Sequence, residues 1–416
     1  MLDNVPMSQS PELRGNDVLA PRMCLLAFLS GNVSMGCMFG SFGVLVAAVE
    51  AKMGITRDLS SLGIPLASLG LGVMSPLAGA LAAKFSIRLL MIAGAVMNVI
   101  AYAVLALSSS ITIDLVAYAL LIGPGIGLAG SVLPMTLITR WYRVNQGRAL
   151  GLMNMPLAPA ILPLATAMAL RAFGLTATYG LLAALMALLV LPLLLVVDFP
   201  PQSTTDRTDN DVAGGAVGPG LTISQLVGRP HFWTLAMGWA AVMMSASIAS
   251  AHLVPMSREW GLNAMQAASL LTAFSAMGAV GTLAFGWLAD RLGYKKAFVL
   301  LCVDSAVVWA AMMLHPPYAL LLLLAGLVGF HGGAAIPVFG VALTRSFGQA
   351  SFGRAFGLGY VVSLPFCLLS VPAAARIYMR TGSYSGAMVG LIGFLVFATL
   401  LIAISRGAKP LIAAPQ

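Results

Sequence analysis

The sequence carries little charge for its length. Only 8% of its 416 residues are Asp, Glu, Lys or Arg, whereas soluble domains carry about 25%. Hydrophobic residues make up 60% of the chain, more than the interior of a soluble fold of this size accommodates. They gather in runs of about twenty residues, the length that crosses ~30 Å of hydrocarbon. The composition therefore excludes a soluble domain and predicts an all-α protein that crosses the membrane many times.

Cysteine and histidine are also scarce, with four of each in the chain. The cysteines lie within apolar runs and form no CxxC pair, so we interpret them as small buried side chains rather than disulfides or metal ligands. The four histidines are spread over separate segments and build no cluster with Asp or Glu. The sequence therefore argues against a membrane-embedded enzyme, and we expect neither a metal nor a cofactor.

The sequence also lacks a nucleotide-binding loop, a soluble sensor domain and a signal peptide. The glycine run GPGIGLAG, Gly123 to Gly130, is not followed by Lys-Ser or Lys-Thr, so it is not a phosphate-binding loop and we expect no direct use of ATP. The longest polar stretch, residues 198–230, is typical of a flexible linker and is short for the domain of a sensor. Residues 1–21 lack the pattern of a signal peptide, and we expect a disordered tail there.

Twelve apolar runs are long enough to span a bilayer, six on each side of the polar stretch. They cover residues 22–49, 60–83, 88–108, 113–139, 149–171, 177–197, 231–256, 266–288, 297–314, 318–344, 355–376 and 386–405. We therefore expect a tail (1–21), a six-helix bundle (22–197), a linker (198–230), a second six-helix bundle (231–405) and a C-terminal tail (406–416).

The basic residues predict how these spans are oriented. If the N-terminus is cytoplasmic, six of the 22 Lys and Arg fall outside, which leaves sixteen inside; the six are Lys52, Arg57, Arg171, Arg258, Arg376 and Arg380. This bias places both termini and the linker in the cytoplasm. We expect the protein to lie in the inner membrane of the cell. The net charge of +9 then follows from topology and contact with anionic lipids, and it calls for no nucleic acid.

The two halves of the chain repeat each other. GALAAKFSIR, which begins at Gly79, corresponds to GWLADRLGYKK, which begins at Gly286, and 286 minus 79 gives an offset of 207. TRWYRVNQGRALGL starts at Thr139 and TRSFGQASFGRAFGL at Thr344, an offset of 205. Two loops that repeat at nearly one spacing predict two pseudo-symmetric bundles around a central site.

GWLADRLGYKK resembles the loop signature of the major facilitator superfamily (MFS). The resemblance implies twelve helices, alternating access and a charged gate between the bundles. Glycines permit close helix approach, and Asp290 can accept hydrogen bonds from a helix N-terminus or an arginine of the other bundle. An ordinary positively charged loop is the alternative. The first copy has Ala83 in place of the acid. The implied gate residues are Gly286, Asp290, Arg291, Gly293, Lys295, Gly79, Arg88, Arg148 and Arg354.

Three further stretches narrow the resemblance to monocarboxylate-porter-like and oxalate/formate-antiporter-like members. They are RWYRVNQGRALGL, HLVPMSREWGLNAMQAASLL and PAAARIYMRTGSYSGAM. The acidic-glycine-aromatic motif that often leads into the first span of those porters is missing from DVLAPRMCLLAFL. The resemblance implies a small organic acid as the substrate.

Ionisable side chains inside spans are costly, and they are candidates for function. Asp304, His331 and His252 lie within predicted spans and can change charge there, as a proton-coupled carrier requires. Each has a structural alternative, namely a hydrogen bond to a neighbouring helix or, for His252, a place at the interface. Asn32 and Asn154, together with Ser34 and Ser363, are polar candidates that bind either substrate or a neighbouring helix.

No Arg or Lys lies near the centre of a predicted span, although carriers of carboxylates commonly hold a cation there. We predict a secondary active transporter, not an enzyme, for a monocarboxylate or related acid, driven by protons as a symporter. Export of an amphipathic or drug-like compound is the alternative, followed by a non-transporting sensor or an embedded enzyme. We expect a monomer whose partners are the solute, protons and lipids.

Overall fold

The computed structural model describes residues 11–142, 144–200 and 220–405, and this part of the chain is helical with no strand. The first half contains α1 (Pro11–Met35), η1 (Gly36–Gly40), α2 (Phe42–Met53), α3 (Arg57–Ser60), α4 (Gly63–Leu81), α5 (Ile87–Leu107), α6 (Ile111–Ala117), η2 (Tyr118–Ile122), α7 (Gly123–Ile126), η3 (Gly127–Ser131), α8 (Val132–Trp141), α9 (Gln146–Met153) and α10 (Leu157–Leu193). The second half contains α11 (Ile223–Val227), α12 (Pro230–Glu259), α13 (Ala264–Leu292), α14 (Tyr294–Met312), α15 (Tyr318–Phe347), η6 (Gln349–Ser351), α16 (Phe352–Thr381) and α17 (Ser385–Ile404).

The predicted twelve-helix fold is confirmed. In the described part, ten helical stretches are apolar and long enough to cross a membrane. One of them, Gln146–Leu193, has 48 residues, enough for two crossings. Gly174 breaks it with φ 78° and ψ 176°, between the predicted spans 149–171 and 177–197. The ten leave out α14, which has 19 residues but carries Lys295, Lys296 and Asp304.

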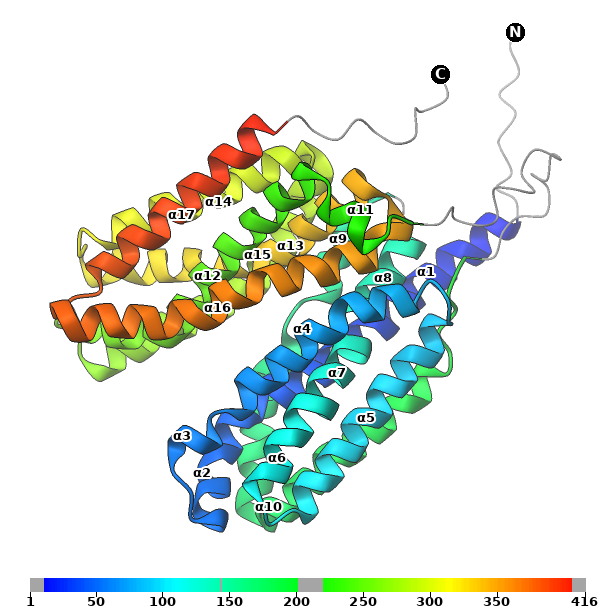
Figure 1. The fold of residues 1–416 in the computed structure, drawn as a ribbon, viewed down its shortest axis with the longest axis horizontal. Helices are drawn as coiled ribbons and strands as arrows, with labels where there is room; N and C mark the ends of the chain where they lie inside the picture. The colour runs from blue at the N-terminus through cyan, green and yellow to red at the C-terminus, as the bar shows by residue number, and fades with distance from the viewer. Residues whose placement is uncertain (1–10, 143, 201–219, 406–416) are drawn as a thin grey trace, which may run out of the picture.

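The helices form two bundles that meet at one end and diverge toward the other (Figure 1). α4 packs along α16, and α9 packs against α13 and α15, so each half contributes matching elements to the contact. The elements α14 and α17 pack on each other, far from the first bundle. Asp198, at the start of the predicted linker, lies at the end where the bundles meet. We call this the linker end of the molecule.

The structure differs from the predicted segments in two places, the N-terminal tail and the linker. Residues 11–21, expected to be a disordered tail, belong to α1, because extending a helix by a turn costs little once it is nucleated and Pro11 suits a first helical position. The predicted linker is ordered at its described ends: Asp198 caps α5, and α11 begins with a capping box of Thr222 and Gln225. Residues 1–10, 201–219 and 406–416 of the predicted tails and linker lie outside the described residues.

The first bundle contains three π-helical segments, η1, η2 and η3, where the helix takes an extra residue in a turn. They interrupt the first and fourth spans. By the repeat offset, the matching helices of the second half are α12 and α15, and both run uninterrupted as α-helix. The two bundles are therefore related in topology but differ in local geometry.

Candidate functional site

Asp290 connects the second bundle to the start of α9 in the first bundle. Its Oδ1 accepts a hydrogen bond from the backbone N–H of Gly147 at 2.9 Å, and its Oδ2 accepts one from the N–H of Arg148 at 3.0 Å. These N–H groups belong to the first turn of a helix, where they have no partner within the helix. The positive end of the helix dipole also favours a carboxylate there. Asp290 therefore joins the bundles through main-chain donors, and the Arg148 side chain stays exposed.

Glycines bring the two backbones together beside Asp290. A Cβ atom added to Gly286 would lie 2.3 Å from the carbonyl oxygen of Gly147, and one added to Gly147 would lie 2.2 Å from the oxygen of Gly286. Ordinary contacts of such atoms start near 3.4 Å. Gly151 approaches Thr282 in the same way, one turn further along. The α9–α13 contact therefore requires glycine at these positions.

The symmetry-related contact lies between α4 and α16. A Cβ atom on Gly79 would lie 2.1 Å from the carbonyl carbon of Gly353, and Gly357 packs on the backbone of Ser75. Ala83 supplies no carboxylate here. The Arg354 guanidinium instead donates to the carbonyl oxygens of Gly220 and Leu221 at 2.9 and 3.2 Å. The two contacts thus share their glycines and differ in their polar bonds.

The remaining basic gate candidates bond within their own halves. The Arg291 guanidinium lies 4.3 Å from the centroid of the Trp287 ring, a cation–π contact inside α13. Lys295 Nζ donates to the carbonyl oxygens of Ala403 and Ser405 at 3.0 and 2.7 Å, at the end of α17. Lys295 therefore satisfies a helix C-terminus in its own bundle. Gly293 takes φ 82° at the turn before α14.

In the first half, Asp198 supplies the carboxylate at the turn after α4. It accepts hydrogen bonds from the N–H groups of Ile87 and Arg88 at 2.8 and 3.2 Å and thereby caps α5. Arg140 lies beside it and donates to the carbonyl oxygen of Ala82 at 2.9 Å. The gate candidate Arg88 takes part in this network through its backbone N–H, which donates to Asp198.

Asp304 of α14 and His331 of α15 form a hydrogen-bonded pair in the second bundle. His331 Nε2 lies 2.7 Å from Asp304 Oδ2. The His331 side chain is fully buried, whereas 46% of the Asp304 side chain is exposed. Asp304 shares its helix face with the exposed Leu300 and Val307, and α14 packs on α15 and α17. The pair therefore faces the outer side of the second bundle rather than the first bundle.

α14 also carries buried polar side chains that face the interior of the second bundle. Trp309 Nε1 donates to Ser245 Oγ at 2.7 Å and ties α14 to α12. Ser305 Oγ and His331 Nδ1 are buried and lack a hydrogen-bond partner within the described part of the chain. A Cβ atom on Gly333 would meet the carbonyl oxygen of Gly278, so this glycine serves the packing of α15 on α13.

Of the other candidates, Asn32 and His252 bond to a neighbouring helix, whereas Asn154 and Ser363 bond to backbone within their own helices. Asn32 accepts from the N–H of Ala158 at 3.0 Å and so caps the start of α10. Asn154 donates to the carbonyl oxygen of Leu150 at 2.8 Å, at the end of α9. His252 Nε2 lies 2.9 Å from the carbonyl oxygen of Val371, which joins α12 to α16. Ser363 donates to the Tyr360 carbonyl oxygen at 2.8 Å. Ser34 is buried, and its Oγ has no partner within the described segments.

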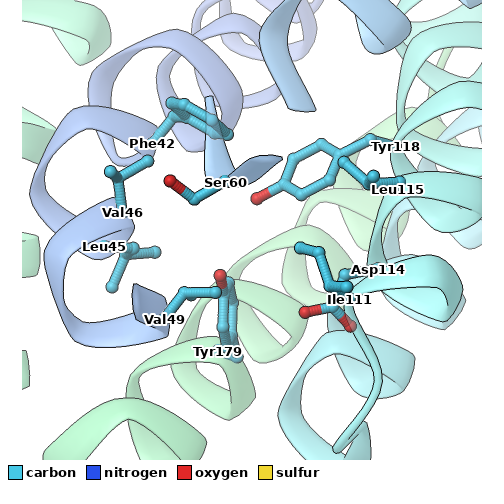
Figure 2. Close-up of a pocket in the computed structure, with 10 residues that line it drawn as sticks. All are labelled: Phe42, Leu45, Val46, Val49, Ser60, Ile111, Asp114, Leu115, Tyr118 and Tyr179. Atoms are coloured by element: carbon cyan, nitrogen blue, oxygen red, sulfur yellow. The ribbon is translucent and has the colours of Figure 1, made fainter. Parts of the chain in front are cut away.

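One buried acid was missed from the sequence. Asp114 is 2% exposed, and it lines a small pocket (Figure 2). The lining residues come from α2, α3, α6, η2 and α10, at the end of the first bundle opposite the linker end (Figure 1). The predicted span 113–139 already contained Asp114, in the stretch ITIDLVAY. Its place near the end of an apolar run makes it look like an interfacial residue. Sequence can locate the residue but not show that α2, α3 and α10 enclose it.

Comparison with known proteins identifies the family that has this architecture. A sequence profile of the Major Facilitator Superfamily matches residues 27–256 and 240–414. The chain belongs to the Major Facilitator Superfamily. It is therefore an integral, multi-pass membrane protein that moves solutes, and it is not an enzyme.

Relatives within the superfamily include bacterial and animal transporters. The uncharacterized MFS-type transporter YcxA of Bacillus subtilis is 23% identical over 85% of this chain and 87% of its own length. Monocarboxylate transporter 13 of Bos taurus is 25% identical over 89% of this chain and 86% of its own. Monocarboxylate transporter 12 of Homo sapiens is 29% identical over 38% of this chain and 31% of its own. The predicted resemblance to monocarboxylate porters is confirmed at this level.

Solved structures support the fold. The MFS transporter FucP, in the outward conformation, superimposes with a TM-score of 0.72 at 14% identity, over 94% of this chain and all of its own. The proton:xylose symporter XylE gives a TM-score of 0.68 at 16% identity, over 93% of this chain and 96% of its own. Both similarities concern the arrangement of the helices.

Proposed function

We propose that this MFS member is a proton-coupled symporter of small monocarboxylates that works by alternating access in an inner membrane. The similarity to monocarboxylate transporters 12 and 13 supports the substrate class. The bias of basic residues supports cytoplasmic termini and linker. In that orientation the contacts at Asp290 close the cytoplasmic end, and the transporter works as a monomer whose bundles tilt against each other.

The Asp304–His331 pair carries the proton coupling. A neutral imidazole has one N–H and one bare nitrogen. With its proton on Nε2, His331 donates to the Asp304 carboxylate, which leaves the buried Nδ1 without a partner. A proton added at Nδ1 creates an imidazolium whose charge is compensated by Asp304 at 2.7 Å. The pair therefore takes up one proton without leaving an isolated charge in the membrane.

The position of the pair assigns it to protons rather than to substrate. Asp304 lies on the outer face of α14, and His331 has no exposed surface. A carboxylate substrate between the bundles does not reach either group. We propose that protonation instead changes how α14, α15 and α12 pack, since the Trp309–Ser245 hydrogen bond ties α14 to α12 and α15 packs against both helices.

Export of an apolar or amphipathic compound is the second candidate. A groove of about 440 Å³ lies between the two halves, near α9 and α13. Its lining is apolar and consists of Met155, Ala279, Val280, Leu283, Ala284 and Trp287. Such a lining suits an apolar solute better than a carboxylate.

Purified protein in vesicles that enclose a pH-sensitive dye tests the proposal, with lactate as the probe. We expect an inward lactate gradient to acidify the lumen faster than in protein-free vesicles. His331→Gln should slow this acidification about tenfold. His315→Gln is the matched control, because His315 lies in the loop after α14 with its ring 5.2 Å from Trp260, remote from the pair.

Acidification in wild-type vesicles at the protein-free rate contradicts proton-coupled lactate transport. Expulsion of an apolar dye by the same vesicles would then favour the second candidate. Equal slowing by His331→Gln and His315→Gln would remove the Asp304–His331 pair from the mechanism.

A further inference from the structure

Asp114 is an ionisable group that the mechanism above does not use. It sits in the first turn of α6, and its side chain is buried. Its Oδ1 has no hydrogen-bond partner within the described residues. A buried carboxylate oxygen without a partner is costly, so native proteins pair it, hydrate it or neutralise it.

The pocket beside Asp114 has the size and lining for one water molecule. Its volume is about 10 Å³, close to the space that a single water requires. Figure 2 shows the hydroxyl groups of Tyr118 and Tyr179 bordering the same space as the Asp114 carboxylate, and Ser60 lines this space as well. A water there would have several polar partners, as buried waters need.

Other ionisable groups border the pocket from each element around it. Lys52 of α2 lies close enough to act on Asp114 electrostatically, and its Nζ donates to the carbonyl oxygen of Ser108 at 2.8 Å. Glu50 accepts from Ser60 Oγ at 2.7 Å. Tyr118 of η2 and Tyr179 of α10 interact with Asp114 electrostatically, and Tyr102 of α5 interacts with Tyr118 in the same way. Two carboxylates beside the Lys52 ammonium do not form a cluster of three metal ligands within the described residues, which disfavours a metal cation.

The fold does not require an acidic residue at the position of Asp114, because the matching positions of the second half are apolar. The repeat offsets of 205 and 207 map Asp114 onto Ala319 and Leu321, which are apolar. Tyr118 is also the first residue of the π-helical segment η2, which has no counterpart in α15. π-Helical turns occur frequently at functional sites.

We propose that Asp114 is a proton-binding residue, and that a buried water in this pocket links its Oδ1 to the hydroxyl groups of Tyr118 and Tyr179. The proton comes from hydronium in the compartment opposite the linker end, forms an O–H bond on Asp114 and leaves a water molecule behind. Its release reverses these changes. The inference rests on the proposed proton coupling and adds a second site, in the first bundle, on the side from which the proton enters.

Infrared difference spectra of the full chain in lipid nanodiscs test the site without a substrate. Spectra recorded at two pH values should contain a C=O band of a protonated carboxylic acid that is lost in Asp114→Asn. The band should persist in Asp304→Asn and His331→Gln, which alter the other pair. Tyr118→Phe, which keeps the carboxylate and removes one hydroxyl, should shift the band without removing it.

Identical difference spectra for wild type and Asp114→Asn would overturn the proposal. If Asp114→Asn does not fold, an unshifted band in Tyr118→Phe overturns the water-linked arrangement. In the lactate assay, Asp114→Asn should slow acidification about tenfold. Absence of lactate-driven acidification in wild type would refute the proposed function alone, because the infrared result still decides whether Asp114 binds a proton.

Discussion

Asp290 holds the linker end closed through two backbone hydrogen bonds, at 2.9 and 3.0 Å. Hydrogen bonds to charged groups contribute about 1.5–3 kcal/mol. Both bonds cross between bundles that must separate when the linker end opens. We therefore propose that Asp290 stabilises the state that is closed at the linker end rather than the fold of one bundle.

Asp290→Asn should shift the molecule toward the state that is open at the linker end. An asparagine side chain has only one acceptor oxygen, so it can accept one of the two hydrogen bonds. Its NH₂ group would then face a backbone N–H, which is also a donor. A loss of about 1.5 kcal/mol changes the population about tenfold. Spin labels at Val144→Cys and Leu292→Cys, exposed positions of the two halves at this end, should report longer distances, and transport should slow.

Ala83→Asp is the matched comparison at the symmetry-related contact. Ala83 is exposed, and the substitution breaks no existing bond, so we expect a smaller effect on transport than from Asp290→Asn. Wild-type rates and unchanged distances in both variants would show that Asp290 is not a latch.

Some contacts of the candidate residues could be predicted from the sequence, and others could not. The position of Asp290 in a loop signature predicted a bond either to a helix N-terminus or to an arginine of the other bundle, and the structure shows the first of these. Asp304 and His331 lie on different helices, and hydropathy does not fix how those helices rotate against each other. Sequence therefore named both residues without pairing them. Asp114 was missed because burial by α2, α3 and α10 is a property of the packed bundle.

At the scale of helices, length and number follow directly from apolar runs. The break at Gly174 falls between two predicted spans because glycine adopts φ 78° without steric cost. The π-helical segments were not predicted from the sequence. One extra residue in a turn leaves the hydropathy pattern almost unchanged, so such segments are hard to see in a sequence.

Gly286→Ala should prevent α13 from packing against α9. The new methyl group would lie 2.3 Å from a backbone oxygen of Gly147, which cannot move as a side chain does. Such overpacking costs about 1–3 kcal/mol, and we expect transport to fall about tenfold or more. The distance between the labels at Val144→Cys and Leu292→Cys should increase.

Gly390→Ala controls for the change of glycine to alanine within a helix. Gly390 lies in α17, and a Cβ atom there meets nothing within 4 Å. Alanine favours helix by about 1 kcal/mol over glycine, so this variant should transport normally and melt no lower than wild type. Normal transport by Gly286→Ala would show that the close contact is not needed for the cycle.

At the scale of the whole molecule, the two halves are asymmetric in their polar groups. The second bundle supplies the Asp290 latch and the Asp304–His331 pair, whereas the first supplies Asp114 and the π-helical segments. In the proposed cycle the bundles tilt against each other, and each carries different ionisable groups. The internal repeat accounts for the paired glycine contacts, whereas the ionisable groups differ between the two halves.

The proposed orientation predicts which end of the molecule faces the cytoplasm. Val144 is 74% exposed at the linker end, and Leu314 is 82% exposed at the opposite end. In a background without the four native cysteines, an impermeant thiol reagent should label Leu314→Cys in intact cells and leave Val144→Cys unmodified. Both should react after the membrane is permeabilised, which controls for exposure of each site. Labelling of Val144→Cys alone would place the linker end outside, and the Asp290 contact would then close the external rather than the cytoplasmic side.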